Sequence, residues 1–247
     1  MTELNQKVAI ITGGAKGIGR AVALDLAANG WAVAICYRKS VTEADELVQA
    51  VQAKSGRALA VKSDVSQSKA AEQLVQHVRQ EWGRIDALIN GAGPYHRVSL
   101  LQETVEGWHS MFDNNLHPVF YLSRAVIPIM RERKWGRIVS FSMANVEQLV
   151  AQPQLTAHYI SKVGLLALSR SFAKLIAADG ITMNCIAPGF IDSVSAPQEE
   201  LSRMVKLIPA GYVGSVDDAI SVVRFLLSEE ARYVNGANIQ LSGAWGV

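Results

Sequence analysis

The residues best placed to do chemistry begin with a glycine-rich turn near the amino terminus. The run TGGAKGIGR, residues 12–20, follows a short apolar segment and leads into an apolar helical pattern. Glycines let a chain turn tightly and bring backbone N–H groups close to phosphate oxygens, and the start of a helix favours negative charge. A turn in this context is typical of a site for the pyrophosphate of a dinucleotide. We therefore expect phosphate contacts from Gly13, Lys16, Gly17, Ile18 and Gly19.

Four further motifs lie downstream of this turn. They read Asp64-Val65, Asn90-Gly91-Ala92-Gly93, Asn115 within an Asn-Asn-Leu run, and Pro188-Gly189-Phe190-Ile191-Asp192-Ser193. Together with the glycine turn, they resemble the short-chain dehydrogenase/reductase family over nearly the whole chain, most closely its 3-oxoacyl-carrier-protein reductase branch. The resemblance implies a nicotinamide coenzyme in contact with Asp64, Val65, Asn90, Gly91, Ala92, Gly93, Pro188, Gly189, Ile191 and Ser193.

The end of the second expected strand indicates which nicotinamide coenzyme binds. NAD sites usually place a carboxylate there to accept hydrogen bonds from the ribose hydroxyls, whereas this corner reads Tyr37-Arg38-Lys39-Ser40. The guanidinium of Arg38 can form a planar fork with a 2′-phosphate, and Lys39 and Lys16 add positive charge. A solvated loop would also account for the basic residues, but it would leave the missing carboxylate unexplained. We therefore expect NADP(H).

Carbonyl reduction needs a hydride from the nicotinamide and a proton for the developing alkoxide. In the family that the motifs resemble, a tyrosine donates the proton, a lysine four residues later lowers the pKa of that tyrosine, and an asparagine holds a relay water. The resemblance places Lys162 in the lysine position, where it would also bind ribose, and Asn115 in the asparagine position. It places His158 where the tyrosine is expected, with Tyr159 one residue later.

Either neighbour could supply the proton. Positions three and four before Lys162 both lie near its helical face, roughly 100° apart from each other. Tyr159 would reach the site if the helix entry were irregular or rotated. His158 could instead act as the acid, because imidazole titrates near neutral pH; otherwise it is a helix-surface histidine with no role.

The family's serine, which polarises the substrate carbonyl, is also displaced. Its position falls on Met143, and Ser142 lies one residue earlier. Successive strand side chains point to opposite faces, so an offset of one residue changes the face on which a hydroxyl lies. We keep Ser142 as the candidate for carbonyl polarisation.

These residues require a scaffold of alternating strands and helices. Short apolar segments typical of buried parallel strands lie at Val8–Thr12, Ala32–Tyr37, Ala58–Val61, Ala87–Asn90, Arg137–Phe141, Thr182–Ile186 and Asn238–Leu241. Helical periodicity lies between them at Gly19–Ala28, Glu43–Lys54, Lys69–Trp82, Leu116–Arg133, Ala157–Ala178 and Asp217–Ser228. The alternation predicts one Rossmann-like α/β domain over residues 1–247, a doubly wound parallel sheet of about seven strands with helices on both faces.

Two segments depart from this alternation. Pro94–Gln102 follows the fourth expected strand and carries Tyr95 and His96, while residues 190–212 form the longest irregular insertion around a short helical piece at Glu199–Lys206. Ligands of open α/β sheets bind beyond the carboxyl ends of the strands. We therefore expect the first segment to form a substrate wall and the second a lid.

Composition excludes several other classes of protein. The formal net charge of +2, from 24 basic and 22 acidic residues, gives no strong field for nucleic acid or anionic lipid. No apolar stretch is long enough to span a bilayer, no cluster has metal-ligand spacing, and no export signal is visible. Cys36 and Cys185 each lie in an apolar segment, which favours buried free thiols and a cytoplasmic protein.

Two hypotheses for function follow. The first is an NADP(H)-dependent oxidoreductase acting on a carbonyl or alcohol, such as a 3-oxoacyl thioester or a small ketone. The second is an NADP(H)-binding sensor or assembly subunit of the same fold with little or no turnover, since the expected tyrosine and serine are displaced. The resemblance also implies a homo-oligomer, a dimer or tetramer, built through the helices Leu116–Arg133 and Ala157–Ala178.

Overall fold

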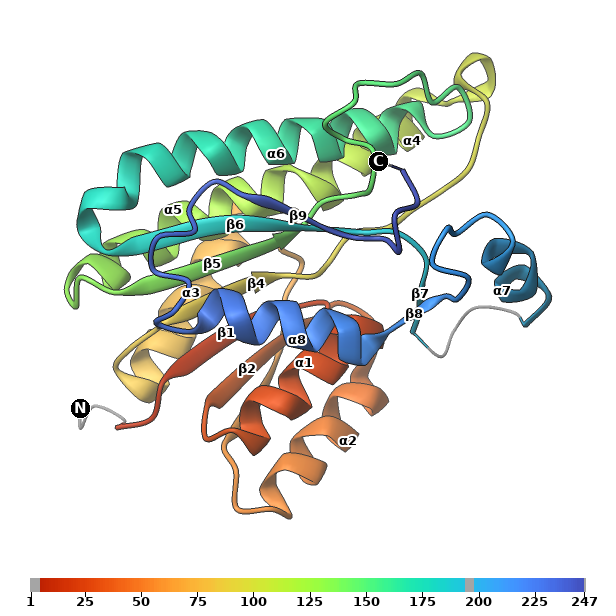
Figure 1. The fold of residues 1–247 in the computed structure, drawn as a ribbon. Coiled ribbons are helices and arrows are strands. Elements are labelled where there is room, and N and C mark those ends of the chain that lie inside the picture. Colours follow the sequence, from red (N-terminus) through yellow and green to blue (C-terminus); the bar gives the residue numbers. More distant parts are fainter. Residues whose placement is uncertain (1–4, 194–197, 247) are drawn as a thin grey trace.

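A computed structural model describes residues 5–193 and 198–246, and its centre is a parallel sheet of seven strands (Figure 1). The strands are β1 Val8–Thr12, β2 Ala32–Tyr37, β3 Ala58–Lys62, β4 Ala87–Asn90, β5 Gly136–Phe141, β6 Ile181–Pro188 and β9 Asn238–Leu241. Their spatial order is β3-β2-β1-β4-β5-β6-β9. The chain order reverses between β1 and β4, so the sheet is doubly wound and has its topological switch point there.

Helices cover both faces of the sheet, as the alternating pattern predicts (Figure 1). One layer holds α1 Gly17–Ala28, α2 Val41–Gln52 and α8 Val216–Leu227. The other holds α3 Ser68–Trp82, α5 His117–Arg131 and α6 Thr156–Ile176, with α4 Val105–Asn115 packed on α5 and α6. This confirms the Rossmann-like fold.

The two cores explain the apolar strand runs. Every residue of β1 is buried, because alternate side chains enter opposite cores: Val8 and Ile10 pack toward α3 and α5, whereas Ala9 and Ile11 pack toward α1 and α2. Strands buried on both faces therefore show no polar alternation. Cys36 and Cys185 are buried free thiols, as expected.

The helix α4 is the main element that the sequence pattern did not predict. Its start is stabilised by Thr104, whose side chain accepts a hydrogen bond from the backbone N–H of Gly107 at 2.9 Å. The chain then changes direction at Leu116, and Pro118 lies in the first turn of α5. The predicted helix Leu116–Arg133 therefore corresponds to α5 alone, and Asn115 is the last residue of α4.

The expected lid contains a helix, but only part of it is described. Residues 194–197 lie outside the described residues, and beyond them α7 Gln198–Val205 stands apart from the two helical layers (Figure 1). A short parallel pair, β7 Ile191–Asp192 and β8 Gly214–Ser215, brings the two ends of this insertion together. The predicted helical piece Glu199–Lys206 thus agrees with α7.

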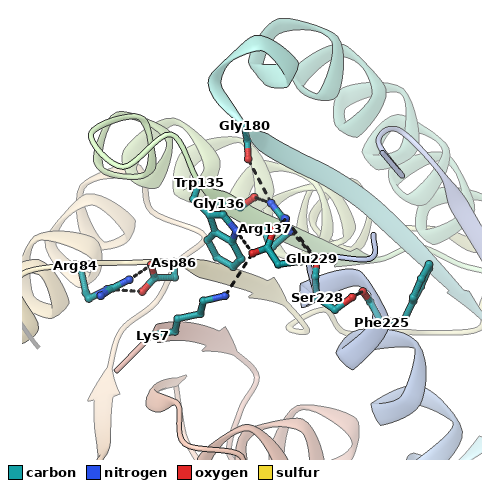
Figure 2. Close-up of polar contacts among 10 residues, drawn as sticks. All are labelled: Lys7, Arg84, Asp86, Trp135, Gly136, Arg137, Gly180, Phe225, Ser228 and Glu229. Carbon is teal, nitrogen blue, oxygen red and sulfur yellow. Dashed lines mark hydrogen bonds and ion pairs between the residues drawn. The ribbon is translucent and has the colours of Figure 1, made fainter. Parts of the chain in front are cut away.

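A polar network stabilises the amino ends of the central strands (Figure 2). The guanidinium of Arg137 in β5 is buried and donates to the carbonyls of Gly136 at 3.0 Å and Gly180 at 3.3 Å, and its Nε donates to Ser228 at 3.4 Å. It also lies over the Trp135 ring, 4.4 Å from the centroid. These contacts tie β5, β6 and α8 together at the edge opposite the glycine turn.

None of the helices within residues 5–193 and 198–246 combines the length and apolarity needed to cross a membrane.

Candidate active site

The glycine turn lies where β1 and β4 end side by side at the switch point. The hydroxyl of Thr12 accepts hydrogen bonds from the backbone N–H groups of Gly91 at 3.2 Å and Ala92 at 3.1 Å, which joins the two loops. Gly13 has a φ of +65°, and a Cβ at Gly19 would lie 2.4 Å from the carbonyl oxygen of Gly13. Larger residues would therefore close the turn that a phosphate must approach.

A cleft of about 380 Å³ opens beside this turn. Most of the expected coenzyme residues line it: Gly13, Lys16, Tyr37, Arg38, Lys39, Ser40, Asp64, Val65, Gly91, Ala92 and Gly93. An adjoining hollow of about 730 Å³ shares Lys16 and Gly91 with it and is lined also by Gly17, Ile18, Gly19 and Ser193. The structure thus gathers these residues around two hollows with shared lining residues, which together are called the groove.

The remaining expected coenzyme residues lie around the groove or apart from it. Asn90 is buried behind the turn, where its amide donates to the hydroxyl of Ser140 at 3.0 Å. The carbonyl of Pro188 accepts from the N–H of Ala144 at 3.2 Å, and Gly189 packs against Ser242. Ile191 lines a separate cavity of about 90 Å³, which Asp218 of α8 also lines.

Two of the basic residues that line the cleft, Lys16 and Arg38, are paired with acidic and amide groups. The ammonium of Lys16 lies 2.7 Å from the carboxylate of Glu43, and this ion pair lowers the pKa of Glu43. The Nη1 of Arg38 donates to Asn114 Oδ1 at 3.0 Å and lies 3.9 Å from Asp64. Asn114 was not predicted as a site residue, although it directly precedes Asn115 in the chain.

Lys162 is buried next to Gly93, which lines the cleft. Its ammonium donates to the carbonyl of Phe141 at 2.8 Å, and burial lowers its pKa to about 8. A Cβ on Gly93 would lie 3.5 Å from that ammonium and 2.3 Å from Asn115 Oδ1. Lys162 and Asn115 therefore meet beside the loop that follows β4.

His158 is buried next to Lys162, and its ring forms a T-shaped contact with the Tyr95 ring at 5.5 Å between centroids. Burial, and then the positive charge of Lys162, lower its pKa to about 4, while a hydrogen bond to the Pro94 carbonyl opposes the shift. Among the described residues Nδ1 is buried without a hydrogen-bond partner. The low pKa keeps the imidazole neutral at pH 7.

Tyr159 points into the core instead. Its side chain is 6% exposed and packs in the cluster between the sheet and α5 and α6. Its hydroxyl donates to the carbonyl of Asn145 at 2.8 Å. The phenol is thus engaged by the loop after β5, while His158, one residue earlier on the helix, faces the Pro94 loop.

Ser142 is also turned away from Lys162. Its hydroxyl contacts the Ile186 carbonyl at 3.1 Å and Asn238 Oδ1 at 2.7 Å, which links β5 to β6 and β9. Met143, at the position where the family places serine, is half-buried and packs against the same core cluster as Tyr159. No serine hydroxyl therefore faces His158 from positions 142 or 143.

The segment after β4 forms one wall above this centre. The backbone N–H groups of Val98 and Leu100 donate to the carbonyls of Gln154 at 3.0 Å and Pro153 at 2.9 Å, so two loops run together above the start of α6. His96 Nε2 lies 2.7 Å from Glu103 Oε2. The Pro94 carbonyl, which serves both His158 and Asn115, is a backbone group that residue types could not reveal.

The geometry fits a nicotinamide dinucleotide. Side chains at Gly13 or Gly19 would collide with the backbone of Gly91 or Gly13 that forms the turn. Asn115 Oδ1 and His158 Nδ1 are buried without hydrogen-bond partners among the described residues. Buried polar atoms without partners are costly unless a ligand or water satisfies them. No cluster of His, Cys, Asp and Glu side chains suited to a metal ion occurs in the described ranges.

Comparisons with known proteins show which family the chain is similar to. A family model described as enoyl-(acyl carrier protein) reductase matches residues 13–244. A 3-oxoacyl-[acyl-carrier-protein] reductase from Synechocystis is 33% identical, covering 98% of both chains, and one from Staphylococcus aureus is 32% identical, covering 96% of this chain and 97% of its own. A crystal structure assigned as a short-chain alcohol dehydrogenase from Sinorhizobium meliloti superposes with a TM-score of 0.89 at 29% identity, covering 98% of this chain and 97% of its own.

Proposed function

Because this chain belongs to the short-chain dehydrogenase/reductase family, we propose that this oxidoreductase transfers a hydride between NADP(H) and a carbonyl or alcohol substrate. The substrate would be a small ketone or a 3-oxoacyl thioester, or the corresponding alcohol, and the similarity to 3-oxoacyl-[acyl-carrier-protein] reductases supports the thioester. The observation that carries the proposal is the cleft beside the glycine turn, where the lining residue Gly93 lies next to Lys162 and Asn115.

The coenzyme, when bound, supplies or accepts the hydride. The N–H groups of the glycine turn would hold its pyrophosphate, and the ammonium of Lys162 would bind its ribose while keeping the bond to Phe141. Asn115, whose Oδ1 is buried and unpartnered among the described residues, would hold a relay water beside Lys162. Arg38, Lys39 and Lys16 support NADP(H) over NAD(H), because no carboxylate occupies the end of β2.

His158 is our choice for proton exchange with the substrate. In alcohol oxidation, the imidazole of His158 accepts the hydroxyl proton while the C–H bond breaks and the carbonyl forms; in reduction, the same proton returns to the oxygen. The low pKa of His158 keeps the imidazole unprotonated at neutral pH, which favours the base role. Tyr159 and Ser142 are hydrogen-bonded within the core and between strands, so we give them structural roles.

The test compares His158→Ala with Tyr159→Phe. Turnover is followed as NADP(H) absorbance with a panel of 3-oxoacyl thioesters, small ketones and alcohols, and coenzyme binding by fluorescence. We expect His158→Ala to lower kcat by about 10²–10⁴-fold while coenzyme affinity is kept, and Tyr159→Phe to keep most of the turnover. Loss of turnover only in Tyr159→Phe would assign the proton to the phenol.

The same experiment separates an enzyme from a coenzyme-binding sensor. The observation favouring a sensor is that the phenol and the hydroxyl expected at the reacting centre are bonded elsewhere. Tight NADPH binding without turnover on any substrate, and no effect of Lys162→Ala on any rate, would support that alternative. Turnover that depends on Lys162 and His158 would exclude it.

We further propose a homo-oligomer formed through α5 and α6. Apolar side chains on these helices are partly exposed to solvent, including Phe120 at 37%, Ile160 at 41% and Leu175 at 72%. Exposed apolar groups gathered on neighbouring helices are typical of an interface. Light scattering would reject the proposal if it found a monomer at micromolar concentration.

A further inference from the structure

Arg38 reaches across the mouth of the cleft from one element to another. It follows β2 directly, yet its Nη1 donates to Asn114 Oδ1, 3.0 Å away, in the last turn of α4. Both residues line the cleft beside the glycine turn. The hydrogen bond between Arg38 and Asn114 therefore holds the guanidinium beside the cleft, at the end lined by residues 37–40.

Asn114 is itself held in one orientation. Its Nδ2 donates to the Ser110 carbonyl at 2.8 Å and lies 3.4 Å from the Ser110 hydroxyl. This leaves Oδ1 as the amide atom that faces Arg38, since the amide nitrogen can only donate. The helix α4 thus presents an oriented acceptor to a flexible arginine.

The nature of this acceptor matters for an anionic ligand. A carboxylate would cancel much of the guanidinium charge, whereas a neutral amide orients it and leaves the charge available. Asp64, the nearest carboxylate, is 3.9 Å from Nη1 and accepts from the Ser66 N–H at 3.2 Å and hydroxyl at 2.7 Å. The arginine side chain is also half exposed, so further N–H donors can reach a ligand.

We propose that Asn114 is a positioning residue for coenzyme selection: it holds the Arg38 guanidinium where a 2′-phosphate on the adenosine ribose can accept its remaining N–H groups. This proposal rests on the NADP(H) dependence proposed above. It assigns discrimination between the phosphorylated and unphosphorylated coenzymes to α4 as well as to the end of β2.

The test measures binding without turnover. Calorimetry compares adenosine 2′,5′-bisphosphate with 5′-AMP, which differ only in the 2′-phosphate, and NADPH with NADH. We expect Asn114→Ala to weaken bisphosphate and NADPH binding about fivefold, the size expected for loss of one orienting hydrogen bond, and to change 5′-AMP and NADH binding less than about twofold. Asn114→Asp should weaken the phosphorylated ligands further, because its carboxylate repels phosphate.

A double-mutant cycle shows whether Asn114 acts through Arg38. In an Arg38→Ala background, Asn114→Ala should cause no further loss of bisphosphate affinity. Ser110→Ala is the matched control, since it keeps the backbone carbonyl that orients Asn114 and should leave both affinities within about twofold. Melting temperatures confirm that each variant is folded.

Three results would overturn the assignment: equal losses for both ligands of a pair, no loss in Asn114→Ala, or a loss that persists without Arg38. Each of these leaves the proposed function intact, because the wild type still binds coenzyme. Failure of the wild type to bind NADPH and NADH would instead remove the proposed function, and the role of Asn114 with it.

Discussion

At the scale of single residues, the exchange of tyrosine for histidine changes which protonation states are needed. Oxidation requires neutral His158, which is present above a pKa of about 4, and the ammonium of Lys162, which is present below a pKa of about 8. We therefore expect kcat/KM for alcohol oxidation to rise through about pH 4 and to fall above about pH 8. Stopped-flow assays across this range would measure both limbs.

Lys162→Arg is the control for the alkaline limb. A guanidinium stays protonated far above pH 8, so any residual activity of this variant should persist into alkaline solution. An alkaline limb that remains near pH 8 in Lys162→Arg would show that another group titrates there.

The buried histidine also makes stability depend on pH. The pKa of His158 is about 4 in the folded chain against an ordinary value of 6.5, so the unfolded chain binds more protons between these values and stability rises with pH across this window. The free energy of unfolding is therefore about 3 kcal/mol higher above pH 6.5 than at pH 4, at about 1.4 kcal/mol per pH unit, as far as His158 is concerned.

We expect His158→Gln to flatten this dependence. Urea unfolding at pH 4.5 and pH 7 would show a smaller difference in unfolding free energy than in the wild type. His77→Gln, at an exposed histidine on α3, should behave like the wild type. If both variants gave the wild-type slope, His158 would not be the group that destabilises the fold in acid.

At the scale of elements, the glycine turn supports a sharper prediction than the helices do. A Cβ at position 19 would lie 2.4 Å from the Gly13 carbonyl, a backbone atom that cannot move aside without opening the turn. We expect Gly19→Ala to weaken NADPH binding at least about tenfold, or about 1.4 kcal/mol. Gly164→Ala in α6 is the control, because its Cβ would meet only the flexible Leu116 side chain at 3.2 Å. Fluorescence titration would contradict the prediction if both variants bound equally.

Most of these elements could be predicted from the sequence. The strands and most helices were predictable because both cores demand apolar runs at fixed periods. The helix α4 was not, since few of its residues are buried and its start depends on the Thr104 cap. The start of α5 was predicted, because the helical pattern that begins at Leu116 coincides with it and Pro118 lies in its first turn.

The candidate site also has a part that the sequence predicts and a part that it does not. The groove residues were predictable because a glycine-rich turn between a strand and a helix, with basic residues at the next strand end, is typical of a phosphate-binding site. The choice between His158 and Tyr159 was not, because the loop after β5 decides it. That loop places Asn145 at a φ of +70° and aims its carbonyl at the phenol. Such a backbone geometry has no signature in the spacing of the side chains.

At the scale of the whole molecule, the two ends of the parallel strands have different roles: one end forms the candidate site and the other stabilises the fold. The groove lies at the carboxyl ends of the strands, and the buried Arg137 network lies at their amino ends (Figure 2). Arg137→Met would leave the carbonyls of Gly136, Gly180 and Ser228 without the donor that satisfies them. We expect a loss of about 2–4 kcal/mol in unfolding free energy, since each buried acceptor left unpaired is costly.

Coenzyme affinity should stay within about twofold in the same variant, because distant sites with no shared partners contribute additively. Arg224→Met is the control: this arginine pairs with Asp25 on the surface, and exposed pairs contribute at most about 1 kcal/mol. Urea unfolding and NADPH titration of both variants test whether the amino ends of the strands affect stability alone. A change in NADPH affinity in Arg137→Met under native conditions would show that the Arg137 network, which joins β5, β6 and α8, also determines the geometry of the groove.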